Sequence, residues 1–238
     1  MKHLYCTIAI GEMYVESAMT FAKRLNEKST THHMLIVCDK DYEPIDNVTY
    51  KIIPEDHVLF TTLSHIFNYN LKYYPLYLAS QMDYNHIIFV DSDWRVRNEY
   101  DETNIHRMLN FMDEQNIDMF YERPHTIGAG KHDGNNCFWR HKRDFYKLLE
   151  TDEYDTGNVC NEQFLVFKNN EKFTIFVNKW KELYQIAAEA NLWGYAEGVE
   201  IGMSYTTAKM VATHTNWEHF IRAMFEFTAI SQQVYIRY

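Results

Sequence analysis

The strongest constraint on the fold is the alternation of two kinds of segment along the chain. Short runs rich in β-branched, aromatic and other apolar residues are separated by stretches in which apolar residues recur with helical spacing. The runs of strand type are residues 4–10, 34–38, 48–53, 86–90, 117–121 and 163–167. Because this alternation is typical of strand-helix-strand units, it predicts an α/β fold, Rossmann-like, with a mixed, mainly parallel sheet flanked by helices.

Four stretches have the apolar spacing of helices. Residues 14–25 place apolar side chains on one face, and residues 173–187 carry the clearest amphipathic pattern. Residues 71–82 form a third helix, with Pro75 either in its first turn or at a kink. Residues 220–230 are expected to form a C-terminal helix whose apolar face packs on the core or on a second copy of the chain.

Charge and hydropathy restrict the partners and the compartment. The formal net charge of the 238 residues is -10 at pH 7, which disfavours a nucleic-acid backbone as the main ligand. No apolar stretch approaches the roughly 20 residues that span a bilayer, and no leader-like segment opens the chain. We therefore expect no membrane span and a cytoplasmic location.

Two carboxylates directly follow the apolar run 86–90, in the sequence Asp91-Ser92-Asp93. Ligands of open α/β sheets bind beyond the carboxyl ends of the strands, so both acids should lie at the ligand edge. Carboxylates about 5 Å apart repel each other by roughly 3 kcal/mol at an effective dielectric constant near 20. A hard cation relieves this repulsion, and Mg²⁺ or Mn²⁺ bound by one or two carboxylates commonly also binds a diphosphate. The motif therefore predicts a Mn²⁺ or Mg²⁺ site for a phosphorylated substrate.

Other interpretations of this motif remain open. Asp91 and Asp93 would also suit a helix cap that faces water. A metal-dependent phosphatase places paired aspartates after a strand, although Arg95 stands where such a motif has a small residue. A sugar nucleotidyltransferase uses a related metal site, and a sugar-binding module without activity is the alternative outside enzymes.

Several short segments, taken in order, resemble one family of enzymes. They are Tyr5-Cys6-Thr7-Ile8-Ala9, Asp39 at the end of the second strand, Lys72, Asp91-Ser92-Asp93, the run 161–167, the run 196–202 and His214. With these segments the chain resembles the GT-A fold glycosyltransferases, in particular their glycogenin-like and galactosyltransferase-like groups. The resemblance implies a hexosyltransferase-like enzyme that moves a sugar from a UDP- or GDP-linked donor to the hydroxyl group of a glycan or another acceptor.

The resemblance also implies roles for residues of the donor site. Base and ribose contacts fall on Thr7, Ile8, Ala9 and Asp39, and ribose or metal contacts on Asp91 and the adjacent Ser92. Metal ligation falls on Asp93, Asp91 and His214, with His219 as the second choice for the histidine. Lys72 either reaches the donor phosphate or sugar or forms an ordinary surface ion pair, and Trp94 is the aromatic residue expected beside the sugar.

Two catalytic routes follow from the same resemblance. An inverting enzyme needs a general base, for which Glu197 and Glu200 are the candidates, although both would also suit a helix start as simple acids. A retaining enzyme needs no such base, and Gln163 is then the residue expected beside the sugar. The whole chain, 1–238, is expected to be one domain, with residues 1–123 binding the nucleotide-sugar and residues 124–238 forming the acceptor side. A homodimer is a further expectation.

Overall fold

The protein is described here from a computed structural model. The structure describes residues 2–29, 31–53, 69–121, 124–126, 148–149, 158–160, 163–190, 197–213 and 218–227. The strands are β1 (His3–Ala9), β2 (His33–Cys38), β3 (Val48–Ile52), β4 (His86–Val90), β5 (Trp94–Val96), β6 (Met119–Tyr121), β7 (Pro124–Thr126), β8 (Asn158–Cys160), β9 (Phe164–Lys168), β10 (Ala212–Thr213) and β11 (Phe225–Phe227). The helices are α1 (Glu12–Lys28), η1 (Tyr69–Lys72), α3 (Tyr73–Ala79), α4 (Glu102–Glu114), α6 (Glu171–Glu189), α7 (Glu197–Thr207) and α8 (Glu218–Met224).

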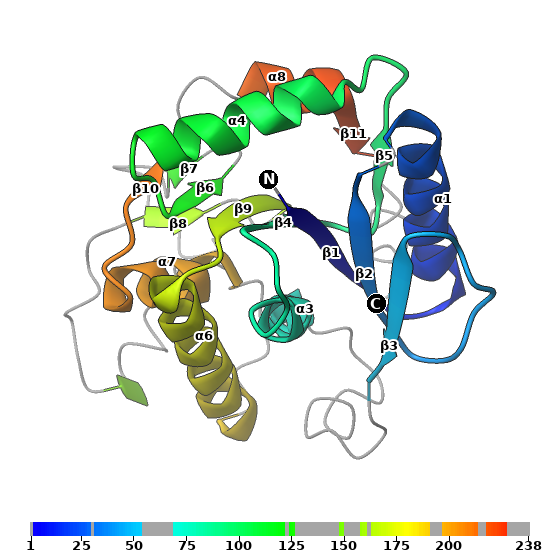
Figure 1. The fold of residues 1–238 in the computed structure, drawn as a ribbon. Helices are drawn as coiled ribbons and strands as arrows, with labels where there is room; N and C mark the ends of the chain where they lie inside the picture. The colour runs from blue at the N-terminus through cyan, green and yellow to red at the C-terminus, as the bar shows by residue number, and fades with distance from the viewer. Residues whose placement is uncertain are drawn as a thin grey trace.

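A seven-stranded sheet in the order β10-β6-β9-β4-β1-β2-β3 forms the centre of the molecule (Figure 1). β4, β1, β2 and β3 are parallel neighbours, and β9 runs antiparallel between β4 and β6. This mixed, mainly parallel sheet flanked by helices confirms the expected α/β fold class. Two short antiparallel pairs, β5 with β11 and β7 with β8, lie outside the main sheet.

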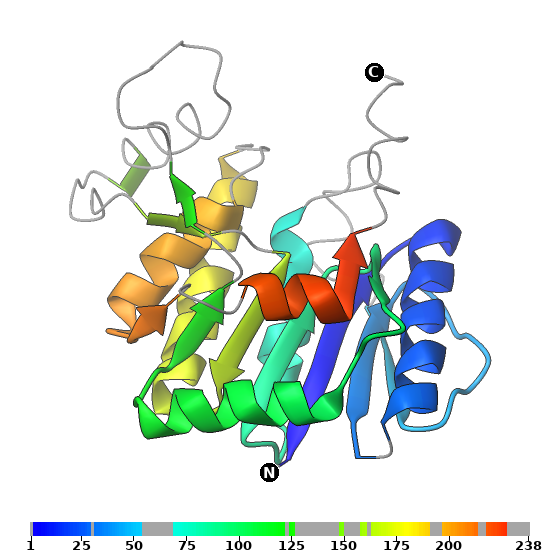
Figure 2. The ribbon, with the colours of Figure 1, turned by 90° about the horizontal axis from the view of Figure 1, so that it is seen from above.

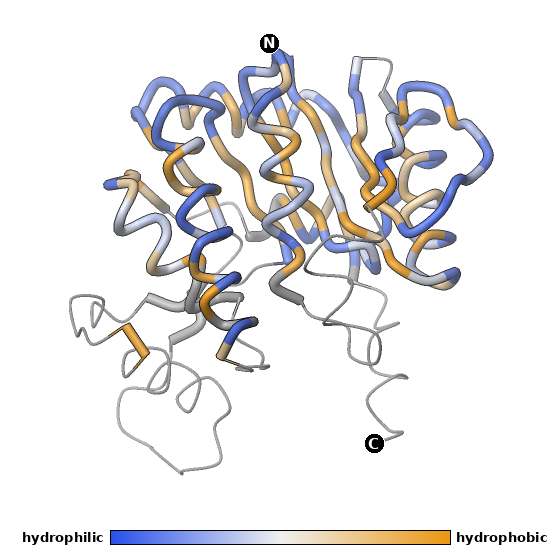
Figure 3. The backbone as a smooth tube through the Cα atoms, turned by 90° about the horizontal axis from the view of Figure 1, so that it is seen from below, coloured by the Kyte–Doolittle hydropathy of each residue, from blue (hydrophilic) through white to orange (hydrophobic). Residues whose placement is uncertain are grey.

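Helices cover both faces of the sheet and so bury strands that are apolar on both sides. α1, α4 and α8 lie on one face, and α3, α6 and α7 lie on the other (Figure 1). Successive side chains of β1 point to opposite faces, so Leu4 and Cys6 pack towards α3 and α6, whereas Tyr5 packs towards α1 and α4. Figure 3 shows the result: the tube is mainly hydrophobic along the strands, and hydrophilic residues gather on the outer helices and turns.

The helical stretches expected from the sequence include neither α4 nor α7, although α4 carries a clear start signal. The side chain of Asp101 accepts a hydrogen bond from the backbone N–H of Thr103 at 2.8 Å, which caps the first turn. The apolar residues that α4 buries are Ile105, Met108, Leu109 and Met112. Their spacing of three or four residues is the helical period, so the sequence of α4 contains a local signal for a helix.

The expected C-terminal helix over residues 220–230 is wrong at residues 225–227, and residues 228–230 lie outside the described part of the chain. α8 ends at Met224, and the next three residues form β11, which pairs antiparallel with β5. Phe225 is buried and stacks on Phe21 of α1 with ring centroids 5.8 Å apart. Burial of this aromatic residue in the core therefore overrides the local helical spacing.

Across the described residues, no helix is both long enough and apolar enough to cross a bilayer.

Candidate donor site

The predicted site lies at a topological switch point of the sheet. From β1 the chain moves outward through β2 and β3 and then returns to β4 on the other side of β1. β1 and β4 are parallel, and both point away from the N-terminus (Figure 2). Adjacent strands whose connections leave in opposite directions open a crevice at their carboxyl ends, which is where ligands of such sheets bind. The segments that follow Ala9 and Val90 therefore border the ligand position.

Asp91 and Lys72 form a buried ion pair at this edge. The Lys72 ammonium lies 2.9 Å from Oδ1 and 3.0 Å from Oδ2 of Asp91, so it contacts both carboxylate oxygens. The exposed fractions of the two side chains are only 5% for Lys72 and 16% for Asp91. Lys72 ends η1 and so comes from a segment that precedes β4. The surface ion pair considered for Lys72 is therefore wrong, because the pair is buried and its partner is the first aspartate of the motif.

Asp93 lies beside the first turn of α1. Asp93 is only 5% exposed. It lies in a tight turn in which the backbone N–H of Trp94 donates a hydrogen bond to the carbonyl of Asp91 at 3.2 Å. Burial, together with the negative charges of Asp93 and Asp91, raises the pKa of Tyr14 on α1. Tyr14 is therefore a neutral phenol close to both carboxylates. The sequence pattern assigned it only to a helix face, because nothing local shows that α1 begins beside the motif.

Asp39, at the carboxyl end of β2, holds the loop between β1 and α1. Its Oδ2 accepts a hydrogen bond from the backbone N–H of Gly11 at 3.0 Å, and its Oδ1 accepts one from the hydroxyl of Tyr42 at 3.2 Å. Gly11 has φ of 86° and ψ of 150°, a conformation close to a region that only glycine adopts readily. A Cβ at Gly11 would meet no atom within 4 Å, so the space next to this backbone is open. The loop is thus shaped for close approach by another molecule.

Gln163 lies next to the aspartates through a backbone contact. The backbone N–H of Asp91 donates a hydrogen bond to the carbonyl of Gln163 at 2.9 Å. This bond lies next to the pair of Val90 and Phe164, the last pair of β4 with β9. The antiparallel direction of β9 explains this position, because such a strand begins at the edge where parallel strands end. The structure therefore brings Gln163 and Asp91 together.

The other predicted catalytic and metal residues are placed only in part. Glu197 and Glu200 lie in the first turn of α7, which packs against η1, the element that carries Lys72. Their side chains lie outside what the structure describes.

The strand that leads to His214 is β10. It ends at Thr213 and is parallel to β6, so it ends at the same edge of the sheet as β4. His214, the next residue, lies outside the described residues, as does the side chain of His219.

The first strand and Trp94 are more deeply buried than the sequence predicts for ligand contacts. Thr7, Ile8 and Ala9 are at most 3% exposed as whole residues, so neither their side chains nor their backbone presents much surface to a nucleotide. Trp94 is 3% exposed and lies 5.8 Å from Phe164 and 6.5 Å from Phe225 between ring centroids. The prediction that Trp94 stacks on the sugar is therefore wrong, because this ring belongs to the core.

The charges at this edge fit a hard cation. Asp39, Asp91 and Asp93 bring three carboxylates to neighbouring strand ends, and the ammonium of Lys72 pairs with Asp91. Carboxylate oxygens are the ligands that Mg²⁺ and Mn²⁺ prefer, and they leave coordination positions for phosphate oxygens. Asp93 lies in the same turn as Asp91 and is a second candidate ligand for such an ion.

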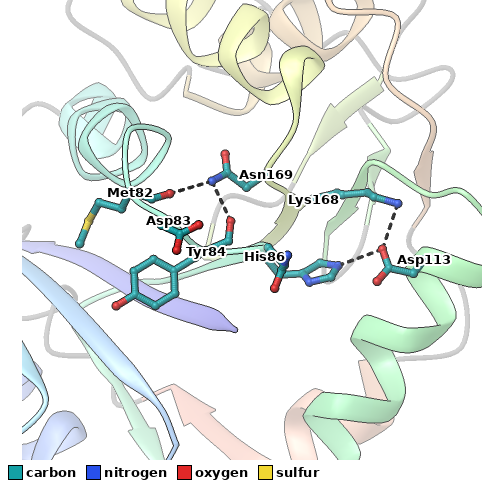
Figure 4. A pocket seen from close by; sticks show the side chains of 8 residues that line it. Met82, Asp83, Tyr84, His86, Asp113, Lys168 and Asn169 are labelled. Atoms are coloured by element: carbon teal, nitrogen blue, oxygen red, sulfur yellow. Dashed lines mark hydrogen bonds and ion pairs between the residues drawn. The ribbon is translucent and has the colours of Figure 1, made fainter. Parts of the chain in front are cut away.

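A hollow among the described residues lies elsewhere. It measures about 710 Å³ and lies at the opposite edge of the sheet, where β4 begins (Figure 4). The lining residues are Met82, Asp83, Tyr84, Asn85, His86, Asp113, Lys168 and Asn169. Within it, Asp113 lies 3.0 Å from the ammonium of Lys168 and 3.3 Å from Nε2 of His86. The hollow is far from Asp91 and Asp93, and it is not the predicted donor site.

Comparison with known proteins gives likeness to solved structures only. No protein-family model matches the sequence, and no curated protein is similar to it. Among solved structures, the apo form of mouse xyloside xylosyltransferase 1 superposes with a TM-score of 0.49 and 9% sequence identity. The match covers 91% of this chain and 86% of the mouse chain. At such an identity the side chains of this chain itself must define the site.

Proposed function

We propose that the protein is a metal-dependent glycosyltransferase that moves a sugar from a nucleotide-diphosphate-sugar to an acceptor hydroxyl group, with a glycan as the expected acceptor. One observation carries this proposal: two carboxylates, Asp91 and Asp93, lie at the switch point between β1 and β4, beside the ammonium of Lys72 that contacts Asp91. A diphosphate with a divalent cation fits an edge where carboxylates follow neighbouring strand ends and the space beside Gly11 is open.

In this proposal several described residues have separate roles in donor binding. Asp93 would hold Mn²⁺ or Mg²⁺, and the bound ion would act as a Lewis acid that stabilises the departing diphosphate. Lys72 orients the carboxylate of Asp91 towards the ribose or the ion. Asp39 fixes the loop at Gly11, so that the backbone there can approach the nucleotide closely. In this proposal residues 1–123 bind the donor and residues 124–238 form the acceptor side, with His214 as a further metal ligand.

A panel of nucleotides tests the donor site directly. UDP, GDP and their sugar conjugates should raise the melting temperature in the presence of Mn²⁺ and much less in its absence, because ligand and ion bind together. Asp93→Ala should lose the Mn²⁺-dependent part of this rise and keep the melting temperature of the free protein within a few degrees. Asp83→Ala is a matched control, since Asp83 is an exposed carboxylate at the opposite edge. If Asp93→Ala responds to Mn²⁺ and nucleotide as the unsubstituted protein does, the site is wrongly assigned.

The choice between inversion and retention concerns α7. In a single inverting displacement a carboxylate must take the proton of the acceptor hydroxyl. We infer that Glu197 or Glu200 supplies it, because α7 packs against the element that ends in Lys72. Proton NMR of the product should then show the inverted anomeric configuration, and the glutamine variant of one of these residues should lose at least about 100-fold in kcat. A retained configuration would remove the base and leave Gln163 as the residue beside the sugar.

The same measurements separate the alternatives. A phosphatase or nucleotidyltransferase would also bind phosphorylated ligands with Mn²⁺, but it would release phosphate or form a nucleotide-sugar instead of a glycoside. A sugar-binding module would show no metal-dependent breakdown of any nucleotide-sugar.

A further inference from the structure

A second group of metal-binding side chains lies at the other edge of the sheet. It consists of His3, the first residue of β1, and of Glu102 and His106 on α4. One nitrogen or oxygen atom from each lies within 4.8 Å of the other two, and Nε2 of His106 is 3.9 Å from Oε1 of Glu102. Glu102 and His106 are four residues apart, so both project from the same face of the helix. His3 points to that face because odd-numbered residues of β1 pack towards α4.

The imidazole of His3 is buried with no hydrogen bond among the described residues. It is 1% exposed, and neither Nδ1 nor Nε2 has a partner. Nε2 of His106 is likewise buried without a hydrogen bond, although the His106 side chain as a whole is 40% exposed. Buried polar atoms nearly always have partners, so such nitrogens require an explanation. A bound cation would supply the missing interaction for one nitrogen of each ring.

The protonation states suit metal binding. Burial, reinforced by the nearby His106, lowers the pKa of His3 to about 4, so the ring is neutral at pH 7 and offers a lone pair. Burial alone would raise the pKa of Glu102, but hydrogen bonds from Thr31 and Ser29 lower it overall, so the carboxylate is ionised. Thr31 donates its hydroxyl to Oε1 of Glu102 and thereby orients this carboxylate, as the outer partners of metal ligands commonly do.

We propose that His3, Glu102 and His106 bind one divalent transition-metal ion, Zn²⁺ in particular, with water in the remaining position. Two imidazoles and one carboxylate form a ligand set that suits Zn²⁺, which accepts nitrogen and oxygen ligands in tetrahedral geometry. Mg²⁺ and Ca²⁺, which prefer oxygen, do not suit two imidazoles. The ion reaches the site from solvent past His106, the most exposed of the three side chains.

This site is distinct from the donor site. His3 begins β1 and Ala9 ends it, so the strand separates the two edges of the sheet by about 20 Å at 3.3 Å per residue. The ion would join the first residue of β1 to the first turn of α4, two elements far apart in the sequence. Its role is therefore to hold the helix against the sheet, and the ion would take no part in the transfer of a sugar.

The test uses the full chain after removal of metals with a chelator. Calorimetry with Zn²⁺ should detect one tight site, and Zn²⁺ should raise the melting temperature. Glu102→Gln removes the charge but keeps the shape, and His106→Ala removes one ring from the exposed side. Each should weaken Zn²⁺ binding by at least about tenfold, because loss of a residue that only supports a metal ligand already lowers metal affinity by about tenfold or more. Co²⁺ should give the intense visible absorption of a four-coordinate ion in the unsubstituted protein only.

Two controls keep the outcome specific. His33→Ala removes an exposed histidine of β2, and Asp93→Ala alters the donor site, so both should bind Zn²⁺ as the unsubstituted protein does. Far-UV circular dichroism of each variant confirms that it is folded. The proposal is overturned if the unsubstituted protein binds no Zn²⁺ tightly, or if folded Glu102→Gln and His106→Ala both retain full affinity. Neither result would bear on Mn²⁺ and nucleotide binding at Asp93.

Discussion

At the scale of single residues, the ion pair of Lys72 and Asp91 is the feature that most affects both stability and ligand binding. Each side chain is mostly buried, so neither charge can return to water if its partner is removed. An ion pair of this kind contributes little net stability compared with two neutral groups, but breaking it from one side is costly. Lys72 therefore helps to set the orientation of the Asp91 carboxylate and how far its charge is neutralised when a ligand binds.

We expect Lys72→Met to lower the free energy of unfolding by about 2–4 kcal/mol, because it leaves the charge of Asp91 without its ammonium. The double variant Lys72→Met/Asp91→Asn should recover at least half of this loss, since both partners are then neutral. Urea unfolding at pH 7 measures both values. An unchanged unfolding free energy for the single variant would mean that other contacts of Asp91 are sufficient to stabilise its charge.

At the scale of elements, Asp118 joins three segments that meet at β6. Its Oδ2 accepts hydrogen bonds from the ammonium of Lys172 at 2.7 Å and from the backbone N–H of Val211 at 2.9 Å. Its Oδ1 accepts a third from the side-chain amide of Asn170 at 3.0 Å. The carboxylate thereby ties β6 to the start of α6 and to the segment before β10, with a side chain that is only 4% exposed.

Asp118→Asn should lower the free energy of unfolding by about 2–3 kcal/mol, because an amide cannot accept all three hydrogen bonds and brings no charge to Lys172. Asp83→Asn is the matched control, since Asp83 forms an ion pair with Lys2 in which its side chain is 98% exposed. Exposed ion pairs contribute about 1 kcal/mol at most, so the control should be nearly neutral. Equal effects of the two substitutions in urea unfolding would contradict the role of Asp118.

The sequence predicted most strands of the main sheet from local patterns, did not predict α4 although its pattern is also local, and missed β11, which depends on a distant contact. β4 is predicted with exact bounds, and the other five strands of the main sheet expected from sequence are shifted by at most two residues at an end, because runs of buried apolar residues are clear signals. β11 was predicted as helix, since its pairing with β5 has no local signature. At the site, Asp91 and Asp93 were recognisable from their strand, whereas the contact with Tyr14 depends on how α1 is placed in three dimensions.

At the scale of the whole molecule, titratable groups with shifted pKa values link stability to pH. Burial, the largest influence, lowers the pKa of His86, which lies in the sheet at the start of β4. Burial alone would raise the pKa of Asp118, but the hydrogen bonds from Lys172, Val211 and Asn170 lower it overall. Both shifts mean that the unfolded chain takes up protons at a higher pH than the folded chain does, so acid favours unfolding.

The free energy of unfolding should therefore fall as the pH drops, in two ranges. Below pH 6.5, His86 in the unfolded chain becomes protonated while the folded form stays neutral, so stability present at pH 7.5 is progressively lost. Below about pH 4, the contribution of Asp118 is lost in the same direction, so the difference between the unsubstituted protein and Asp118→Asn should shrink. Urea unfolding at pH 7.5, 5.5 and 3.5 in the presence of a chelator measures both effects. A constant difference for Asp118→Asn across this range would contradict the lowered pKa of Asp118.

The antiparallel strand β9 also has a consequence during synthesis of the protein. β4 pairs with β1 on one side as soon as both have left the ribosome, but its other side waits for β9. The ribosome must first add residues 91–163, which at about 5–20 residues per second takes on the order of 4–15 s. During this interval the apolar strand His-Ile-Ile-Phe-Val has an unpaired edge that can join another nascent chain. The strand that positions the two aspartates is therefore a point at which newly made chains are prone to aggregate.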